Sequence, residues 1–144
     1  MIGGGVVGGG VAEMLSNMEG VHLHTIVVRD AAKLRDWTVP KGCALSMNVN
    51  DVLNDDRVRI VIEVMGGVSL AKKYVMSALR CGKHVVTANK AMMAAHMAEF
   101  EDTLLDTATQ LRFSAAVGGG IPIVATLQKH MLMPTPIRKV YGIM

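Results

Sequence analysis

Near the amino terminus, glycines are spaced in the way that a dinucleotide diphosphate requires. Gly3, Gly5 and Gly8 fit the pattern G-x-G-x-x-G, and apolar residues then recur at the helical period from Val7 to Met18. In such a turn the first glycine permits the bend, the second admits the pyrophosphate, and the third lets the helix pack on its strand. The N–H groups at the start of the helix would face the anion. A flexible glycine-rich arm is the alternative for so glycine-dense a stretch.

A second candidate group lies a little over twenty residues after the first glycine. Residues 21–28 are mostly apolar, as in a strand buried on both faces of a parallel sheet, and end in Arg29 and Asp30. Arg29 could pair with the 2′-phosphate of NADP, with help from Lys33 or Arg35. Asp30 could instead accept from the 2′-hydroxyl of NAD and repel a phosphate. Because Arg29 follows the predicted strand directly and Asp30 comes after it, the sequence favours NADP over NAD.

Small and polar residues also follow two later apolar segments. Residues 58–64 predict a strand that ends at Met65 and Gly66, and residues 84–87 predict another that leads to Lys90. Ligands of a doubly wound sheet bind at the carboxyl ends of its strands, so Gly66 is a candidate for close approach to a cofactor. Lys90 is a candidate for holding a substrate oxygen and stabilising negative charge on it. A plain strand-to-helix turn and a solvated lysine are the alternatives.

A second glycine-rich loop runs from Val117 to Pro122, after a predicted strand over residues 111–115. Its three consecutive glycines indicate backbone approach to a ligand or ion, or a turn with positive φ. Pro122 suits the first turn of a helix that continues through Met131, because a helix start tolerates the missing N–H.

The remaining elements alternate between helix and strand. We expect a short helix capped by Asn50, a helix capped by Ser69 that stops at Gly82, a helix over about 92–108, and a last strand over 137–143. Such alternation predicts an α/β fold, a Rossmann-like doubly wound parallel sheet.

Length and composition limit what the chain can be. The 144 residues suit a single dinucleotide-binding domain over 1–144, and 51% of them are hydrophobic. Only Met1 and Ile2 precede the glycines, where the fold needs about five strand residues, so we expect the first strand to be cut. Cys43 and Cys81 lack the spacing of a zinc site.

Charge and hydropathy exclude other classes. The net charge of +3 comes without a basic block or interleaved aromatics, so we expect no nucleic-acid partner. No apolar run reaches the roughly 18 residues of a membrane helix, and nothing has the pattern of a signal peptide. We therefore expect a cytoplasmic protein with no membrane partner.

Five segments together resemble the cofactor-binding domain of homoserine dehydrogenase. They are residues 3–8, 27–30, 63–67, 82–90 and 116–123. The resemblance covers nearly the whole chain, and its most specific parts are Thr-Ala-Asn-Lys at 87–90 and Val-Gly-Gly-Gly-Ile-Pro-Ile at 117–123.

The resemblance implies an NAD(P)-dependent oxidoreductase acting on a CH–OH group. Members of that family interconvert L-homoserine and L-aspartate 4-semialdehyde in the biosynthesis of threonine, methionine and isoleucine. The positions it implies for the pyrophosphate are Gly3, Gly5, Val6, Val7 and Gly8, and those along the nicotinamide are Met65, Gly66 and Thr87. Lys90 is implied beside both cofactor and substrate, as the catalytic position of this chain.

A sodium ion is also implied, because some members bind one through backbone carbonyls at the positions of Val117, Gly119 and Ile121. A ligand position that is usually glutamate is Ser114 here, which leaves the ion site open. The family's acid/base lysine and substrate carboxylates lie in a second domain, through which the enzyme dimerises.

We therefore expect this chain alone to bind the cofactor without turning over homoserine, and a homodimer only for the full-length enzyme. Another semialdehyde or amino-acid dehydrogenase of the same fold, and a non-enzymatic dinucleotide-sensing module, are the competing interpretations.

Overall fold

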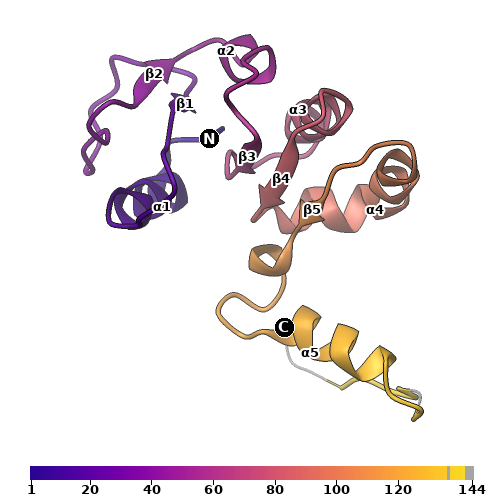
Figure 1. The fold of residues 1–144 in the computed structure, drawn as a ribbon. Coiled ribbons are helices and arrows are strands. Elements are labelled where there is room, and N and C mark those ends of the chain that lie inside the picture. The colour runs from indigo at the N-terminus through magenta and orange to yellow at the C-terminus, as the bar shows by residue number, and fades with distance from the viewer. Residues whose placement is uncertain (136, 142–144) are drawn as a thin grey trace.

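A computed structural model describes residues 1–135 and 137–141 and shows one sheet with helices on both faces (Figure 1). The helices are α1 (Val6–Ser16), α2 (Asn50–Leu53), α3 (Ser69–Arg80), α4 (Lys90–Leu105) and α5 (Ile123–Met131), with a 3₁₀ turn η1 (Ser114–Ala116). The strands are β1 (Thr25–Val27), β2 (Ala44–Ser46), β3 (Ile60–Glu63), β4 (His84–Thr87) and β5 (Leu111–Arg112).

All strand pairings are parallel. β1 pairs with β2, β3 with β4, and β4 with β5. Ile2 forms parallel bridges to both Val27 and Glu63 and so lies between β1 and β3. Its N–H donates to the Ile62 carbonyl at 2.7 Å, and its own carbonyl accepts from the Val64 N–H at 2.9 Å. The spatial order β2, β1, Ile2, β3, β4, β5 is that of a doubly wound dinucleotide-binding sheet, as predicted.

The alternation of side chains along the strands divides the core between the two faces of the sheet. Ile26 and Val28 pack with Ala12 of α1 on one face. Val27, between them, packs in a second cluster with Val61 and with residues of α2, α3 and α4. Helix α1 therefore covers one face while α3 and α4 cover the other, which confirms the doubly wound arrangement.

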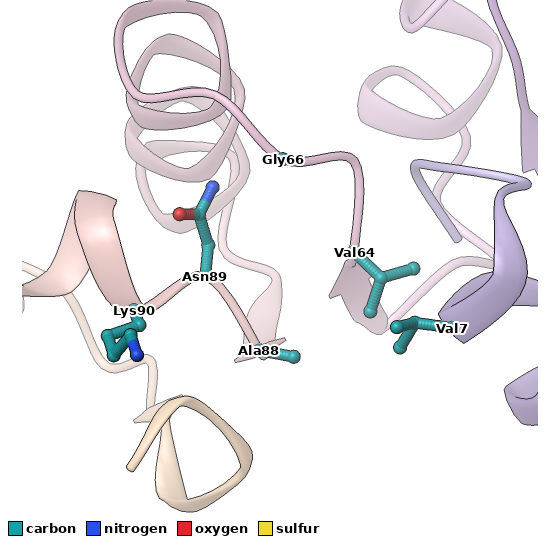
Figure 2. Close-up of a pocket in the computed structure, with 6 residues that line it drawn as sticks. All are labelled: Val7, Val64, Gly66, Ala88, Asn89 and Lys90. Carbon is teal, nitrogen blue, oxygen red and sulfur yellow. The ribbon is translucent and has the colours of Figure 1, made fainter. Parts of the chain in front are cut away.

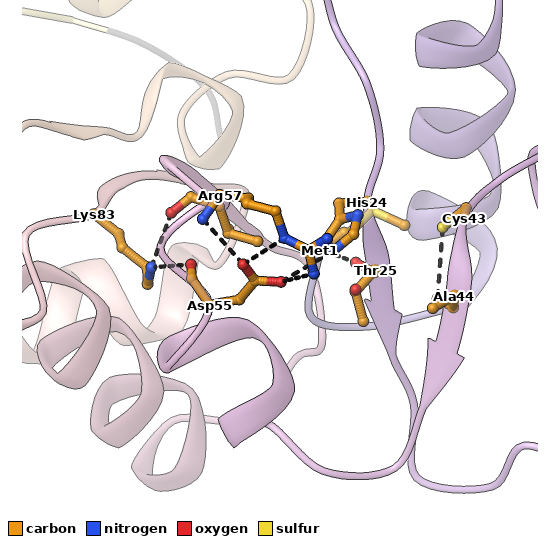
Figure 3. A network of polar contacts seen from close by, with 9 residues as sticks. Met1, His24, Thr25, Cys43, Ala44, Asp55, Arg57 and Lys83 are labelled. Carbon is orange, nitrogen blue, oxygen red and sulfur yellow. Dashed lines mark hydrogen bonds and ion pairs between the residues drawn. The ribbon is translucent and has the colours of Figure 1, made fainter.

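A polar network ties together the amino-terminal edge of the sheet (Figure 3). The buried Lys83 donates from Nζ to the carbonyls of Asp55 and Val58, both at 2.8 Å. The Asp55 carboxylate accepts from Arg57 Nε at 3.0 Å and lies 3.0 Å from His24 Nε2. The Arg57 guanidinium holds the pKa of Asp55 well below its usual range. This network fixes the edge opposite the carboxyl ends of the strands and so supports the fold.

The predicted starts of α2 and α3 are close to the observed ones, but the capping roles predicted for Asn50 and Ser69 are wrong. Asn50 and Ser69 are the first residues of α2 and α3, and neither helix has a cap bond from its N-cap side chain. Instead, Asn48 Oδ1 accepts from the Asn50 N–H at 3.0 Å. Gly82 has φ +74° just after α3 and takes the predicted left-handed position.

The carboxyl-terminal part departs further from expectation. α4 begins at Lys90 and ends at Leu105, with a break in helical geometry at His96. The strand predicted over 111–115 stops at Arg112, because Ser114–Ala116 turns into η1. Residues 137–141 form no regular structure, and the rest of the strand predicted over 137–143 lies outside the described residues.

Candidate functional site

The glycine turn begins at Gly3, directly after Ile2 in the middle of the sheet. Gly3 has φ +110°, and a side chain there would place its Cβ 2.7 Å from the carbonyl carbon of Val64. Only glycine fits this bend without strain. The turn therefore lies against the segment that follows β3, at the point where the strand order reverses. In open α/β sheets, such a point is where ligands bind.

Gly8 and Gly5 have contrasting surroundings. A Cβ on the buried Gly8 would fall against the Gly3 carbonyl oxygen and 3.1 Å from the Gly3 carbonyl carbon, so this glycine lets α1 fold closely back on the turn. Gly5 is the N-cap of α1, and a Cβ on it would meet nothing within 4 Å. The first helical bond runs from the Gly9 N–H to the Gly5 carbonyl at 2.8 Å. The N–H groups before it are available to an anion on the open side of Gly5.

Trp37 covers the inner side of the glycine run. A Cβ on Gly9 would clash with Cδ1 of the indole, and one on Gly4 would lie 3.2 Å from its Cζ2. The Arg35 guanidinium lies 5.9 Å from the centre of the indole ring. The glycines outside the motif thus make room for the indole, a role that their spacing alone did not indicate.

Next to the turn is a cavity of about 210 Å³ between the carboxyl ends of β3 and β4 (Figure 2). Its lining residues are Val7, Val64, Gly66, Ala88, Asn89 and Lys90. Three of them, Val7, Gly66 and Lys90, were predicted from the sequence, whereas Val64, Ala88 and Asn89 were not. Ligand pockets usually measure about 300–1,000 Å³, so this cavity suits one end of a dinucleotide.

The electrostatics of this cavity favour negative charge. Val7 lies in the first turn of α1, and Lys90 is the first residue of α4, so two helix amino termini meet at the same space. Lys90 is exposed and adds a full positive charge. Asn89 caps α4, because its Oδ1 accepts from the Met92 N–H at 3.1 Å. The arrangement can hold phosphate oxygens or an oxygen on which negative charge develops.

Thr87 lies beneath the cavity and does not line it. Its side chain is buried, and its Oγ1 donates to Glu63 Oε2 at 2.5 Å. The same oxygen accepts from the Asn89 N–H at 3.0 Å. Met65 lies next to Gly66 and donates its N–H to Glu63 Oε1 at 2.9 Å. The buried Glu63 connects these residues, and sequence reasoning had treated it only as part of a strand end.

Arg29 is exposed just beyond the end of β1 and does not line the cavity. The neighbouring Asp30 carboxylate accepts from the Ala32 N–H at 2.8 Å. Arg35 donates to the carbonyls of Lys33 at 2.6 Å and Asp30 at 2.5 Å. Asp30 and Arg35 thus shape the loop, whereas the Arg29 side chain extends from it into solvent.

The second glycine-rich loop is separate from the cavity lining. Gly119 has φ +60°, and the Ile121 N–H donates to the Gly118 carbonyl at 3.1 Å. The Ile121 carbonyl accepts from the Ile123 N–H at 2.8 Å, while Val117 is half-buried. Within residues 1–135 and 137–141, no three side chains of His, Cys, Asp or Glu are placed to share a metal ion.

In the part of the chain that the structure describes, every helix falls short of the length and apolar character that crossing a bilayer demands.

Comparison with known proteins gives consistent results. Residues 3–116 match the family described as "Homoserine dehydrogenase, NAD binding domain". The homoserine dehydrogenase of Bacillus subtilis is 38% identical over 99% of this chain and 35% of its own length. That of Synechocystis is 32% identical over 100% of this chain and 34% of its own length.

A solved structure of a similar protein agrees with the fold. The homoserine dehydrogenase of Thiobacillus denitrificans matches with a TM-score of 0.80 and 35% identity, over 89% of this chain and 31% of that one. The chain spans about a third of the length of the relatives that it matches.

Proposed function

The chain belongs to the family of homoserine dehydrogenase NAD-binding domains, and on that premise we propose that it binds NADP or NAD at the carboxyl edge of its sheet. There it serves the interconversion of L-homoserine and L-aspartate 4-semialdehyde, in threonine, methionine and isoleucine biosynthesis. The observation that carries the proposal is the open space at Gly5, at the amino terminus of α1 and at the strand-order reversal. The family resemblance expected from the sequence is confirmed.

The residues fit the two ends of a dinucleotide differently. The backbone of the glycine turn, with Gly3, Gly5, Val6, Val7 and Gly8, would hold the pyrophosphate. Met65 and Gly66 would lie along the nicotinamide end, with Thr87 supporting them from beneath. The bound cofactor would supply the acceptor for a hydride from the carbon that bears the alcohol. The residues of this chain would orient that end of the cofactor.

We propose Lys90 as the catalytic residue of this domain. Its ammonium would hold the substrate oxygen and stabilise the negative charge on it, because it lies at a cavity that two helix amino termini already make positive. In a chain that joins these residues to the substrate domain of a relative, Lys90→Met should lower kcat for homoserine oxidation by about a hundredfold. The Kd for NADPH should change little. An unchanged kcat would contradict the role.

The cofactor preference depends on Arg29. Titration of the purified chain with NADPH and NADH, followed by the fluorescence of Trp37, should show saturable binding with NADPH preferred. Arg29→Ala should lower the affinity for NADPH by about tenfold or more, because a guanidinium–phosphate pair is lost. It should lower the affinity for NADH by less than about twofold.

The matched control for that variant is Arg59→Ala. Arg59 is also exposed but precedes β3, at the opposite edge of the sheet, so its loss removes the same charge without touching the site. Equal weakening of NADPH and NADH by Arg29→Ala would contradict the assignment. Absence of binding to either ligand by the unchanged chain would contradict the proposed function itself.

A sodium ion in the loop of Val117, Gly119 and Ile121 is part of the same proposal. The left-handed conformation of Gly119 and the oxygen ligands that a hard cation prefers support it. Thermal unfolding of the chain, followed by Trp37 fluorescence, should have a lower midpoint in potassium than in sodium. Equal midpoints would rule the ion site out.

Three further points complete the proposal. Residues 1–144 act as a single dinucleotide-binding domain, which works with a substrate domain that carries the acid/base group. The enzyme acts in the cytoplasm on small-molecule substrates and forms a homodimer through the substrate domain. The hydrodynamic mass of the purified chain tests the last point, since a stable dimer of these residues alone would contradict it.

A further inference from the structure

Glu63 is a fully buried carboxylate at the end of β3, below the cavity. Both of its oxygens accept hydrogen bonds, Oε1 from the Met65 N–H and Oε2 from the Thr87 hydroxyl. Among the described residues, it takes part in no ion pair. Burying a charge without a paired cation is costly, and only good hydrogen bonds reduce that cost. A carboxylate at such a place calls for a role beyond packing.

The hydrogen bonds from Glu63 continue into the lining of the cavity. Thr87 Oγ1, which donates a hydrogen bond to Glu63, also accepts one from the Asn89 N–H at 3.0 Å. Asn89 in turn donates from Nδ2 to the Gly67 carbonyl at 2.6 Å and caps α4 through Oδ1. The turn after β3 is thus held at both ends, by Glu63 at Met65 and by Asn89 at Gly67.

This turn needs to be held from outside. Gly66 and Gly67 both have φ +75°, and a Cβ on either would meet no atom within 4 Å. Two successive glycines without packing neighbours restrict the backbone little by themselves. On the other side, the backbone of Val64 and Met65 is the surface against which Gly3 bends. The hydrogen bonds of Glu63 therefore fix the distance between the glycine turn and the Lys90 side of the cavity.

We propose that Glu63 is a positioning residue for the nicotinamide end of the dinucleotide. Through Met65 it sets the Gly66 turn, and through Thr87 and Asn89 it sets the start of α4 and hence Lys90. The inference rests on the proposed function of the cavity. It adds a residue that touches neither cofactor nor substrate but determines where the residues that touch them lie.

Glutamine would replace the carboxylate only in part. Its side chain has the same shape but only one acceptor oxygen, whereas both Met65 N–H and the Thr87 hydroxyl donate to Glu63. If the amide oxygen faces Met65, the amide N–H groups face Thr87 Oγ1, which can accept one of them only if its own proton turns away and loses its acceptor. If the amide oxygen faces Thr87, the amide N–H groups point at the Met65 N–H. Both arrangements weaken the network without a change in side-chain volume.

The test compares two ligands on the full chain. NADPH uses both ends of the site, whereas 2′-phospho-ADP-ribose uses the adenosine and diphosphate end alone. Glu63→Gln should lower the affinity for NADPH by about tenfold and the affinity for 2′-phospho-ADP-ribose by less than about twofold. Thr87→Val should give the same pattern. The double variant should lose less than the product of the two single losses, because Glu63 and Thr87 belong to one hydrogen-bond network.

Val61→Ala is the matched control for a purely structural effect. Val61 is fully buried on the same strand, but its side chain packs in the core, so its truncation lowers stability without altering the ratio of the two affinities. The positioning role would be overturned if Glu63→Gln and Thr87→Val lowered the affinities for both ligands equally. It would also be overturned if neither variant lowered the affinity for NADPH. Failure of the unchanged chain to bind either ligand would overturn the proposed function and this inference with it.

Discussion

Replacing Gly5 by alanine is expected to weaken NADPH binding about a hundredfold or more while changing the free energy of unfolding by only about 1 kcal/mol, because Gly5 is the N-cap of α1. The φ of −81° and ψ of −161° at Gly5 are open to alanine, and the added Cβ would meet no atom of the chain within 4 Å. The methyl group would be felt only by a ligand whose phosphates approach the backbone there. We expect a loss of about a hundredfold or more in NADPH affinity, measured by Trp37 fluorescence alongside urea unfolding.

Gly10→Ala is the control for that result. Gly10 lies within α1, and its added Cβ also meets open space. This variant should bind NADPH normally and gain about 0.5–1 kcal/mol in stability, because alanine is the better helix former. If Gly5→Ala bound NADPH as well as Gly10→Ala does, the diphosphate would not lie against the glycine turn.

Gly8→Ala is expected to cause the largest loss of folding stability of any glycine substitution in α1. The added Cβ would overlap the Gly3 carbonyl oxygen and lie 3.1 Å from the Gly3 carbonyl carbon, and neither backbone atom can move without displacing the turn. We expect a loss of about 3 kcal/mol or more in the free energy of unfolding, measured in urea. The gain in helix propensity, about 1 kcal/mol, does not offset it.

Gly9→Ala shows how much less stability is lost when the added Cβ overlaps a side chain and not the backbone. Its Cβ would overlap Cδ1 of Trp37, whose indole can shift, so the loss should be smaller than for Gly8→Ala and should be accompanied by a change in Trp37 emission. Equal stabilities of Gly8→Ala and Gly10→Ala would show that α1 does not pack on the turn in solution.

The parts of the site that could be predicted are those where residue type alone limits the backbone. Gly3 and Gly82 have positive φ, and only glycine adopts that conformation readily, so their positions marked a turn and a helix end. The polar residues after β4 were likewise recognised, because parallel strands carry ligands at their carboxyl ends. The doubly wound parallel fold followed from the alternation of strand and helix, whereas β2 was not predicted.

The supporting residues could not be predicted, because they depend on register. Glu63 meets Thr87 only because β3 and β4 pair with these two residues opposite each other, and no local pattern specifies that pairing. Asn89 was recognised as a polar residue at a strand end, but its capping of α4 depends on where that helix begins. The caps assigned to Asn50 and Ser69 were wrong for the same reason, since a shift of one residue moves the cap.

The position of Ile2 has a consequence for how the chain folds. Among the described residues, Ile2 provides the strand pairing that joins the β1–β2 half of the sheet to the β3–β5 half. Each half can form from elements close in sequence, whereas insertion of Ile2 closes a long loop and is entropically slow. The cavity between the glycine turn and the carboxyl ends of β3 and β4 should therefore form in the last folding step. A dinucleotide bound there would contact both halves, so it would stabilise the folded chain increasingly as its concentration rises.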